Sequence, residues 1–266
     1  MNLLHFFAAT AVCLLPLPSL AAGCGGDVEC RIGDGSYRIE QLPEGKSKGV
    51  VLFFHGYKSS AEAQMKHRAL VEVAHAHGLA FAAVDGVNGT WSHGGSPSQD
   101  REETAFIAQV FDDLQERFGF SSSKIVVSGF SQGASMAWYT LCSQGERIAG
   151  AVTFSGVFWN PLPTPRDCAT GIPPIVHFHG RTDRTFPLAG RPIGTRFHQG
   201  STFISRDIIR QSAGCAMPPA REKKIGGIMC EVDQGCSRGD IALCIHEGGH
   251  RVDPSLLDAG LTQIGF

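Results

Sequence analysis

Mostly apolar runs alternate with amphipathic segments along the chain. Runs of strand length occupy residues 49–54, 79–84, 124–127, 148–154 and 174–179, and residues 36–40 alternate as a half-buried strand does. Helical spacing of apolar side chains predicts helices over residues 61–77, 100–118, 132–142 and 201–213. Because strands and helices take turns, the pattern predicts a single α/β domain. We expect a mostly parallel sheet with helices on both faces.

The first 22 residues have a different pattern. They contain no Lys, Arg, Asp or Glu, and their apolar run ends in Ser19-Leu20-Ala21-Ala22. This composition is typical of a secretory signal peptide, so we expect residues 1–22 to be removed and residues 23–266 to fold outside the cytoplasm, secreted or periplasmic. A lipid anchor at Cys24 is the alternative, because Ala21-Ala22-Gly23-Cys24 resembles a lipobox. A membrane span is not expected, since prolines interrupt the run.

Composition and net charge limit the classes of binding partner that we expect. The chain has 266 residues, 42% of them hydrophobic, and a formal net charge of −2. Nucleic-acid binders usually carry a basic surface, so this balance argues against a nucleic-acid partner. A neutral or weakly charged substrate, small or polymeric, fits better. The oligomeric state is left open by the sequence.

Eight cysteines lie outside the expected signal peptide, and an even number in an exported chain suggests disulfides. Sequence order alone does not fix the connectivity. A short N-terminal loop and a hairpin of residues 228–232 with 241–245 narrow it, and the remaining cysteines then pair by exclusion. No spacing forms the paired Cys-x-x-Cys of a zinc site, so no metal or other cofactor is expected. The favoured pairs are Cys24 with Cys30, Cys142 with Cys168, Cys215 with Cys236, and Cys230 with Cys244.

A Gly-x-Ser-x-Gly motif lies between the strand that ends at residue 127 and the helix that begins near Gln132. Its residues are Gly129-Phe130-Ser131-Gln132-Gly133. A serine on such a sharp strand-to-helix turn has its hydroxyl lifted above the sheet, and the turn needs small residues on both sides. A serine that merely caps a helix would explain neither glycine. We therefore predict that Ser131 is the nucleophile of an α/β-hydrolase.

A serine hydroxyl needs a base, and the base needs a carboxylate that holds its tautomer. Asp183 follows the strand that ends near Phe178 and is the expected carboxylate. His250, in a glycine-rich loop after residues 241–246, is the expected base. His246 competes for this role, but it belongs to the strand itself.

Acyl transfer also needs donors for the developing oxyanion. In this fold one donor is the N–H of the residue after the nucleophile, here Gln132. The second comes from the loop after an earlier strand, and Tyr57 of His55-Gly56-Tyr57 lies at that place. The oxyanion hole is therefore predicted at Tyr57 and Gln132.

Four aromatic or histidine side chains are candidates for substrate binding. His55 lies in the oxyanion loop, and Trp91 lies in a turn-rich loop after residues 79–84, where ligands bind in open α/β sheets. Phe158 and Trp159 lie in the proline-rich connection of residues 157–173. Packing of these loops onto the domain explains the same residues equally well.

Together, His55-Gly56, Asp85-Gly86 with Trp91, the Ser131 motif, His179-Gly180 with Asp183, and Gly248-Gly249-His250 resemble the bacterial polyhydroxybutyrate depolymerase and feruloyl esterase family. This family comprises exported α/β-hydrolase serine esterases, and the likeness runs from about residue 24 to residue 250. It implies ester hydrolysis through an acyl-enzyme. The chain departs from many relatives at Gln132, where they have Asn, and after His250, where they have an aromatic residue.

The resemblance implies several ester substrates. We expect hydrolysis of poly- or oligo-hydroxyalkanoate esters in a single domain without a large lid. The first alternative is a feruloyl or acetylxylan esterase acting on plant polysaccharide. A non-catalytic exported binding protein with the same fold is the further alternative, and the presence of Ser131, Asp183 and His250 argues against it.

Overall fold

The computed structural model describes residues 23–43, 47–168, 171–216 and 220–266. The signal peptide expected at residues 1–22 lies outside these ranges. Ten strands form the main sheet, in the order β1-β2-β4-β3-β5-β6-β8-β13-β12-β11. They are β1 (Cys30–Ile32), β2 (Gly35–Glu40), β3 (Gly49–Phe54), β4 (Leu79–Val84), β5 (Ile125–Phe130), β6 (Gly150–Phe154), β8 (Ile175–Gly180), β11 (Arg221–Ile225), β12 (Ile228–Asp233) and β13 (Ile241–His246).

The six central strands of this sheet are parallel, and the pairs at its two ends are antiparallel. The helices are α1 (Ala61–Met65), α2 (Arg68–Ala76), α3 (Glu103–Phe118), α4 (Gln132–Gln144), α5 (Thr202–Ser212) and α6 (Pro254–Gln263), with short 3₁₀ turns η2 (Val87–Gly89), η3 (Ser122–Lys124) and η4 (Gly145–Arg147). Among the described residues, no helix combines the length and apolar character needed to cross a membrane.

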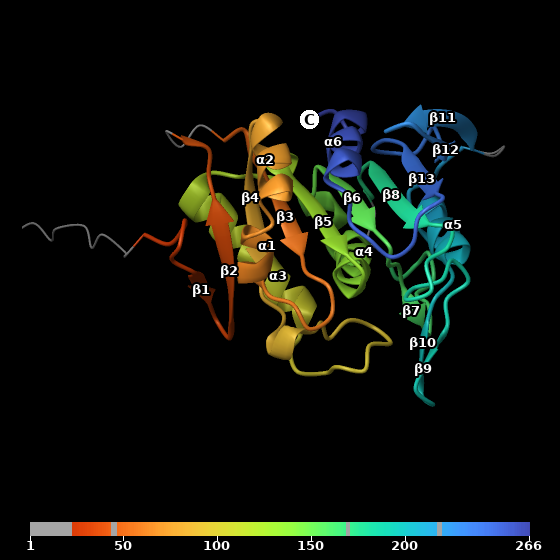
Figure 1. Ribbon diagram of the computed structural model, residues 1–266, viewed down its shortest axis with the longest axis horizontal. Helices are drawn as coiled ribbons and strands as arrows, with labels where there is room; N and C mark the ends of the chain where they lie inside the picture. Colours follow the sequence, from red (N-terminus) through yellow and green to blue (C-terminus); the bar gives the residue numbers. More distant parts are fainter. Residues whose placement is uncertain (1–22, 44–46, 169–170, 217–219) are drawn as a thin grey trace, which may run out of the picture.

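Alternate side chains of the central strands enter two separate cores. In β3, Val50, Leu52 and Phe54 pack on the face that α3, α4 and α5 cover. Val51 and Phe53 point to the opposite face, which α1, α2 and α6 cover. Figure 1 shows these two helical layers around the sheet. The two-sided burial explains why the strands are nearly continuous apolar runs, and it confirms the predicted α/β-hydrolase architecture.

The predicted helix over residues 61–77 is in fact two helices. Ser60 caps α1, which ends at Met65, and α2 begins after His67. Arg68 at the start of α2 makes a bidentate ion pair with Glu40 of β2, which links this helix to the sheet.

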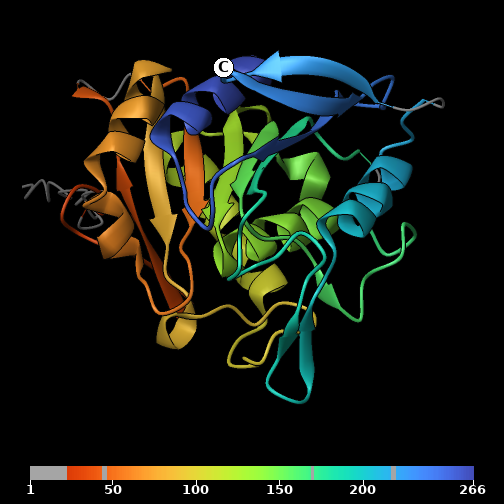
Figure 2. The same cartoon turned by 45° about the vertical axis from the view of Figure 1, so that its right-hand side comes forward.

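A second, three-stranded sheet was not expected from the sequence. It pairs β7 (Trp159–Asn160) with β10 (Phe197–Gln199), and β10 with β9 (Pro192–Ile193). The β9–β10 hairpin projects from the body of the molecule in both views (Figures 1 and 2). The proline-rich connection of residues 157–173 is therefore anchored at its start by pairing with a distant segment.

All four expected disulfides are confirmed. Cys230 and Cys244 occupy facing positions on β12 and β13, as the predicted hairpin requires. The Cys24 sulfur is bonded to Cys30, which argues against the alternative of a lipid anchor at that thiol. The pairs are Cys24–Cys30, Cys142–Cys168, Cys215–Cys236 and Cys230–Cys244.

Candidate active site

Three loops that carry the candidate residues leave the sheet at one edge. Ser131 follows β5, Asp183 follows β8, and His250 follows β13. These strands are parallel, with β6 between β5 and β8, and with β8 and β13 as direct neighbours. Because the carboxyl ends of parallel strands meet at the same edge, sheet order alone gathers three segments that are far apart in sequence.

Ser131 has the strained backbone that is expected at a nucleophile elbow. Its φ is 58° and its ψ is −124°, a backbone conformation that residues other than glycine rarely adopt. A Cβ on Gly133 would lie 2.1 Å from the Phe54 carbonyl oxygen, and one on Gly129 would lie 2.4 Å from the Gly133 carbonyl oxygen. The two glycines of the motif are therefore required by close approach of the backbone.

A third glycine supports the elbow and was missed in the sequence. A Cβ on Gly156, just after β6, would lie 2.0 Å from the carbonyl oxygen of Ser131. The Ser131 N–H also donates to the carbonyl of Phe154, the last residue of β6. The signal in the sequence was the Ser155-Gly156 step directly after an apolar strand. The nucleophile turn is thus held by β6 as well as by its own strand and helix.

Asp183 and His250 form a direct hydrogen bond. His250 Nδ1 donates to Asp183 Oδ2 at 2.7 Å. The other carboxylate oxygen, Oδ1, accepts the N–H groups of Thr185 and Phe186, each at 2.8 Å. Burial alone would raise the pKa of Asp183, but the hydrogen bonds from His250 and Phe186 outweigh it, so the pKa lies below its usual value. Asp183 is therefore an ionised, fixed partner for His250.

Backbone contacts between two loops bring this pair together. The Arg181 N–H donates to the His246 carbonyl, and the Thr182 N–H donates to the Gly248 carbonyl. A Cβ on Gly180 would lie 2.3 Å from that same Gly248 oxygen. The close approach of Gly180 to the Gly248 carbonyl explains the glycine at position 180.

His246, the competing base, has a different role. It belongs to β13, and its Nδ1 accepts the N–H of Gly248 at 3.0 Å. Burial lowers its pKa, with a further lowering from the charge of Arg251. The Asp183 carboxylate bonds to His250 and not to His246 in the described structure. His246 therefore shapes the loop that presents His250.

The residue before Ser131 contacts the ring of His250. The ring of Phe130, the residue before Ser131, lies 4.6 Å from the ring of His250. Within the described part of the chain, no hydrogen bond joins Ser131 to His250. Catalytic hydrogen bonds are often long in enzymes without substrate and tighten only when substrate binds.

The two expected oxyanion donors both have unused N–H groups. Gln132 is the first residue of α4, where an N–H has no partner within the helix. Across the described residues, the Tyr57 N–H has no hydrogen-bond partner either. A Cβ on Gly56 would lie 3.6 Å from the Cβ of Ser131, so the loop that carries Tyr57 passes directly beside the serine. Both N–H groups are therefore available as donors, and their role as an oxyanion hole stays a prediction.

The Gln132 side chain fastens a third loop to this site, a role not anticipated from the sequence. Its Oε1 accepts the Thr90 hydroxyl at 2.9 Å, and its Nε2 donates to the Trp91 carbonyl at 3.3 Å. The same nitrogen lies 3.4 Å from the Ser96 hydroxyl. One amide therefore links the residue after Ser131 to residues 90–96.

The four residues expected to bind substrate all lie in the interior. His55, Trp91 and Phe158 are fully buried, and Trp159 is 5% exposed. The Trp91 indole donates to the His55 carbonyl, and His55 Nε2 accepts the Gly86 N–H. The Trp159 indole donates to Ser135 of α4. These contacts favour the packing alternative, and direct substrate contact by the four side chains stays a prediction.

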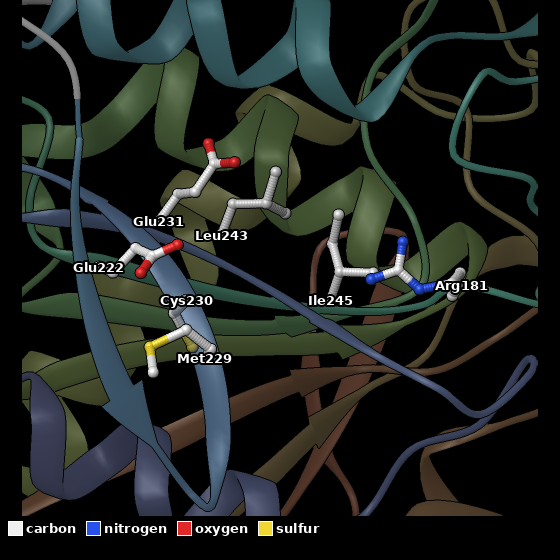
Figure 3. Close-up of a pocket in the computed structure, with 7 residues that line it drawn as sticks. All are labelled: Arg181, Glu222, Met229, Cys230, Glu231, Leu243 and Ile245. Atoms are coloured by element: carbon white, nitrogen blue, oxygen red, sulfur yellow. The ribbon is translucent and has the colours of Figure 1, made fainter.

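A hollow on the sheet lies apart from these residues. It has a volume of about 180 Å³. Its lining includes Glu222, Glu231 and Leu243 of strands β11, β12 and β13 and Arg181 from the loop after β8 (Figure 3). Ser131, Asp183 and His250 do not line it. Among the described residues, no cluster of three His, Cys, Asp or Glu side chains is arranged to hold a metal ion.

Comparisons with known proteins found similarity to esterases. Residues 95–206, which include Ser131 and Asp183, match the phospholipase/carboxylesterase family. The chain is 30% identical over 153 residues to NocK of Nocardia uniformis subsp. tsuyamanensis, which its name describes as an esterase; the match covers 56% of this chain and 43% of NocK. It is 25% identical over 180 residues to feruloyl esterase C of Emericella nidulans, covering 66% of this chain and 59% of that protein.

The fold has a close counterpart among solved structures. Acetyl xylan esterase from Aspergillus awamori superimposes with a TM-score of 0.65 at 16% identity, over 87% of this chain and 94% of that one. The chain spans about half the length of the curated relatives it matches. The feruloyl esterase part of the resemblance is thus confirmed, and the polyhydroxybutyrate part stays a prediction. The chain therefore has the α/β-hydrolase fold, and its residues 95–206 are similar to the phospholipase/carboxylesterase family.

Proposed function

We propose that the chain cleaves esters through a triad of Ser131, His250 and Asp183. The observation that carries this proposal is the Asp183–His250 hydrogen bond at the same sheet edge as the strained Ser131 turn. Because His250 Nδ1 donates to Asp183, the neutral ring has Nε2 free to accept a proton. That nitrogen takes the proton of Ser131 as the serine oxygen attacks the ester carbonyl.

The reaction then has two halves. The carbonyl oxygen becomes an oxyanion that accepts the N–H groups of Tyr57 and Gln132. His250 gives its proton to the departing alcohol, which leaves the acyl group on Ser131. Water activated by His250 attacks this acyl-enzyme, releases the acid and restores the serine. Asp183 stabilises the charged ring in both halves.

For the substrate, we propose acyl esters of plant polysaccharide, with feruloyl and acetyl groups as the two candidates. The support is the similarity to feruloyl esterase C and the fold shared with acetyl xylan esterase. Hydroxybutyrate oligomers, the first expectation from the sequence, have no counterpart among the relatives described above. They belong in the assay as the competing substrate.

We also propose that residues 1–22 direct export and that residues 23–266 are the working enzyme. The charge-free apolar leader supports export. The four disulfides support it independently, because disulfides persist in oxidising compartments. Recovery of a mature protein that begins near residue 23 after expression with its own leader tests this step.

The deciding experiment compares the wild-type protein with Ser131→Ala. Hydrolysis of p-nitrophenyl acetate, methyl ferulate, acetylated xylan and hydroxybutyrate oligomers is measured side by side, together with labelling by a fluorophosphonate. We expect Ser131→Ala to lose labelling and all ester hydrolysis. Ser143→Ala, an exposed serine at the far end of α4, is the matched control and should behave as wild type. Full activity in Ser131→Ala would overturn the proposal, whereas absence of labelling in the wild type would favour the binding-protein alternative.

A further inference from the structure

A chain of buried hydrogen bonds runs from helix α4 to the Asp183 turn. The Trp138 indole nitrogen lies 3.2 Å from the Thr153 hydroxyl, which lies 2.8 Å from His177 Nδ1. His177 Nε2 lies 3.0 Å from His179 Nδ1, and His179 Nε2 lies 2.7 Å from the carbonyl oxygen of Phe186. Four side chains and one carbonyl thus connect three elements, α4, β6 and β8, to the loop after β8.

The two ends of this chain fix its direction. The Trp138 indole can only donate, so Thr153 accepts from it and donates to His177 Nδ1. The Phe186 carbonyl can only accept, so His179 carries its proton on Nε2. His179 Nδ1 is then an acceptor, and His177 donates to it from Nε2. Each histidine has one possible tautomer, and every donor in the chain has one acceptor.

Both histidines are kept neutral by their surroundings. His177 is 2% exposed and His179 is fully buried. Burial lowers the pKa of His177 far below its usual value, and the neighbouring His179 lowers it further. Burial also lowers the pKa of His179, although the Phe186 carbonyl and Asp183 act in the opposite direction. Neutral rings are what a one-directional chain requires.

Phe186, at the end of this chain of hydrogen bonds, is also bonded to the candidate carboxylate of Asp183. Phe186 donates its N–H to Asp183 Oδ1, and its carbonyl accepts from His179. His179 Nε2 lies 3.6 Å from Asp183 Oδ2, which is too long for a hydrogen bond, so its proton goes to Phe186 instead. The hydroxyl of Thr202, the first residue of α5, lies 3.4 Å from His179 Nδ1. Both backbone groups of Phe186, its N–H and its carbonyl, are therefore hydrogen-bonded, and this holds the turn of residues 183–186 in place.

We propose that His179 is a positioning residue, with its own ring orientation fixed by the hydrogen bond from His177. By donating to the Phe186 carbonyl, His179 keeps Asp183 Oδ2 directed toward His250. His179 does not touch the substrate in this proposal. It fixes the turn whose N–H groups occupy Asp183 Oδ1, and Oδ2 is left for His250. The inference rests on the proposed Ser131–His250–Asp183 triad.

A matched pair of substitutions at His179 tests the proposal. The amide nitrogen of His179→Gln reaches the place of Nε2 and can still donate to Phe186, whereas His179→Asn reaches only the place of Nδ1. We expect His179→Asn to lower kcat about 10- to 100-fold, the size of loss that a small misplacement causes, with KM unchanged within about twofold. His179→Gln should recover most of kcat. Rates are divided by the concentration of sites that a fluorophosphonate labels, so that unfolded protein is not counted.

The same two substitutions, Gln and Asn, can be made at His177, which lies one hydrogen bond further from Asp183 than His179 does. His177→Gln keeps a donor toward His179 and should resemble wild type, and His177→Asn should lose kcat. This second pair decides the matter if His179→Asn does not fold. Tyr37→Phe is the control for loss of a buried hydrogen bond, because Tyr37 bonds to Asp113 far from the site. It should lower stability and leave kcat unchanged.

The Asp183→Asn background separates this inference from the proposed function. If His179 acts through Asp183, His179→Asn should cost no further kcat once Asp183→Asn is present. An equal fold-loss in both backgrounds, or equal kcat for His179→Asn and His179→Gln, would overturn the positioning role. Wild-type kcat in Asp183→Asn alone would instead overturn the triad itself.

Discussion

His250 Nδ1 and Asp183 Oδ2 lie 2.7 Å apart although 67 residues separate them in the sequence. Neither residue belongs to a helix or a strand of the sheet. Their approach depends on the β8–β13 pairing and on the backbone bonds from Arg181 and Thr182 to the opposite loop. The pair is therefore a product of sheet topology, and its chemistry can be tested without altering the sheet.

Replacing Asp183 by Asn should remove most of the rate while keeping the fold. An amide can present its N–H to His250 Nδ1 and so favour the wrong tautomer, and in a well-studied serine protease this change costs kcat about 10⁴-fold. We expect a loss of similar order, measured as kcat on p-nitrophenyl acetate. Asp258→Asn is the control, since Asp258 is an exposed partner of His77. A kcat for Asp183→Asn within threefold of wild type would contradict the assignment.

Gly156→Ala should disturb the nucleophile turn from the side of β6. The new Cβ would lie 2.0 Å from the Ser131 carbonyl oxygen, so one of the two backbones must shift. We expect kcat/KM to fall about 100-fold and the free energy of unfolding to fall by about 1–3 kcal/mol. Gly145→Ala is the matched control, because its nearest neighbour would be 3.3 Å away. Equal kinetics in the two variants would show that the contact is not needed.

Gln132→Glu should loosen residues 90–96 while leaving the main-chain donor in place. The amide that donates to the Trp91 carbonyl becomes a carboxylate oxygen facing that carbonyl in a site that is 6% exposed. We expect about 1–3 kcal/mol less stability in urea unfolding, and a change in KM larger than the change in kcat. Gln115→Glu, at an exposed position of α3, should show neither effect. A kcat loss without a KM change would point to the oxyanion hole instead.

Stability should fall as the pH drops from 7 to 5, in part because of His93. This ring is 4% exposed, its Nε2 has no partner among the described residues, and burial lowers its pKa to about 4. The unfolded chain, with a histidine pKa of about 6.5, therefore binds the proton more readily, so stability is complete above about 6.5 and falls below it. The expected loss at pH 5 is about 2 kcal/mol from this residue.

The measurement is urea unfolding at pH 7 and pH 5 for the wild type and His93→Phe. Phenylalanine keeps the stacking on Tyr139, whose ring centroid lies 5.0 Å from that of His93, but it cannot take up a proton. The variant should lose less stability than the wild type over this range. The same pH slope in both proteins would place the effect elsewhere.

The sequence predicted the residues whose roles follow from local spacing. The apolar runs identified the central strands because two-sided burial requires them, and the spacing of glycines around Ser131 identified the turn. Cys230 and Cys244 could be paired because a hairpin places them opposite each other. Such features depend on neighbours in the chain, and a periodicity of two or 3.6 residues carries them.

Side-chain destinations across the molecule could not be predicted in this way. Trp91 is a large aromatic residue in a loop, and nothing in its neighbours indicates that its indole meets the His55 carbonyl. The link from Trp138 through Thr153 to His177 depends on sheet order, since the three residues belong to α4, β6 and β8. The Gln132 amide likewise bonds to residues 41 and 42 positions away. Hydrogen bonds of this kind leave no period in the sequence.

The order of β5, β8 and β13 along the chain sets a sequence of events during synthesis. A ribosome completes the strand and turn of Ser131 first and the Asp183 loop later, and the loop of His250 comes after β13. On the proposed mechanism, a growing chain carries a serine that has no base. The hydroxyl becomes reactive only when β13 adds to the sheet beside β8. On this mechanism, ester cleavage therefore has to wait until the last parallel strand is in place.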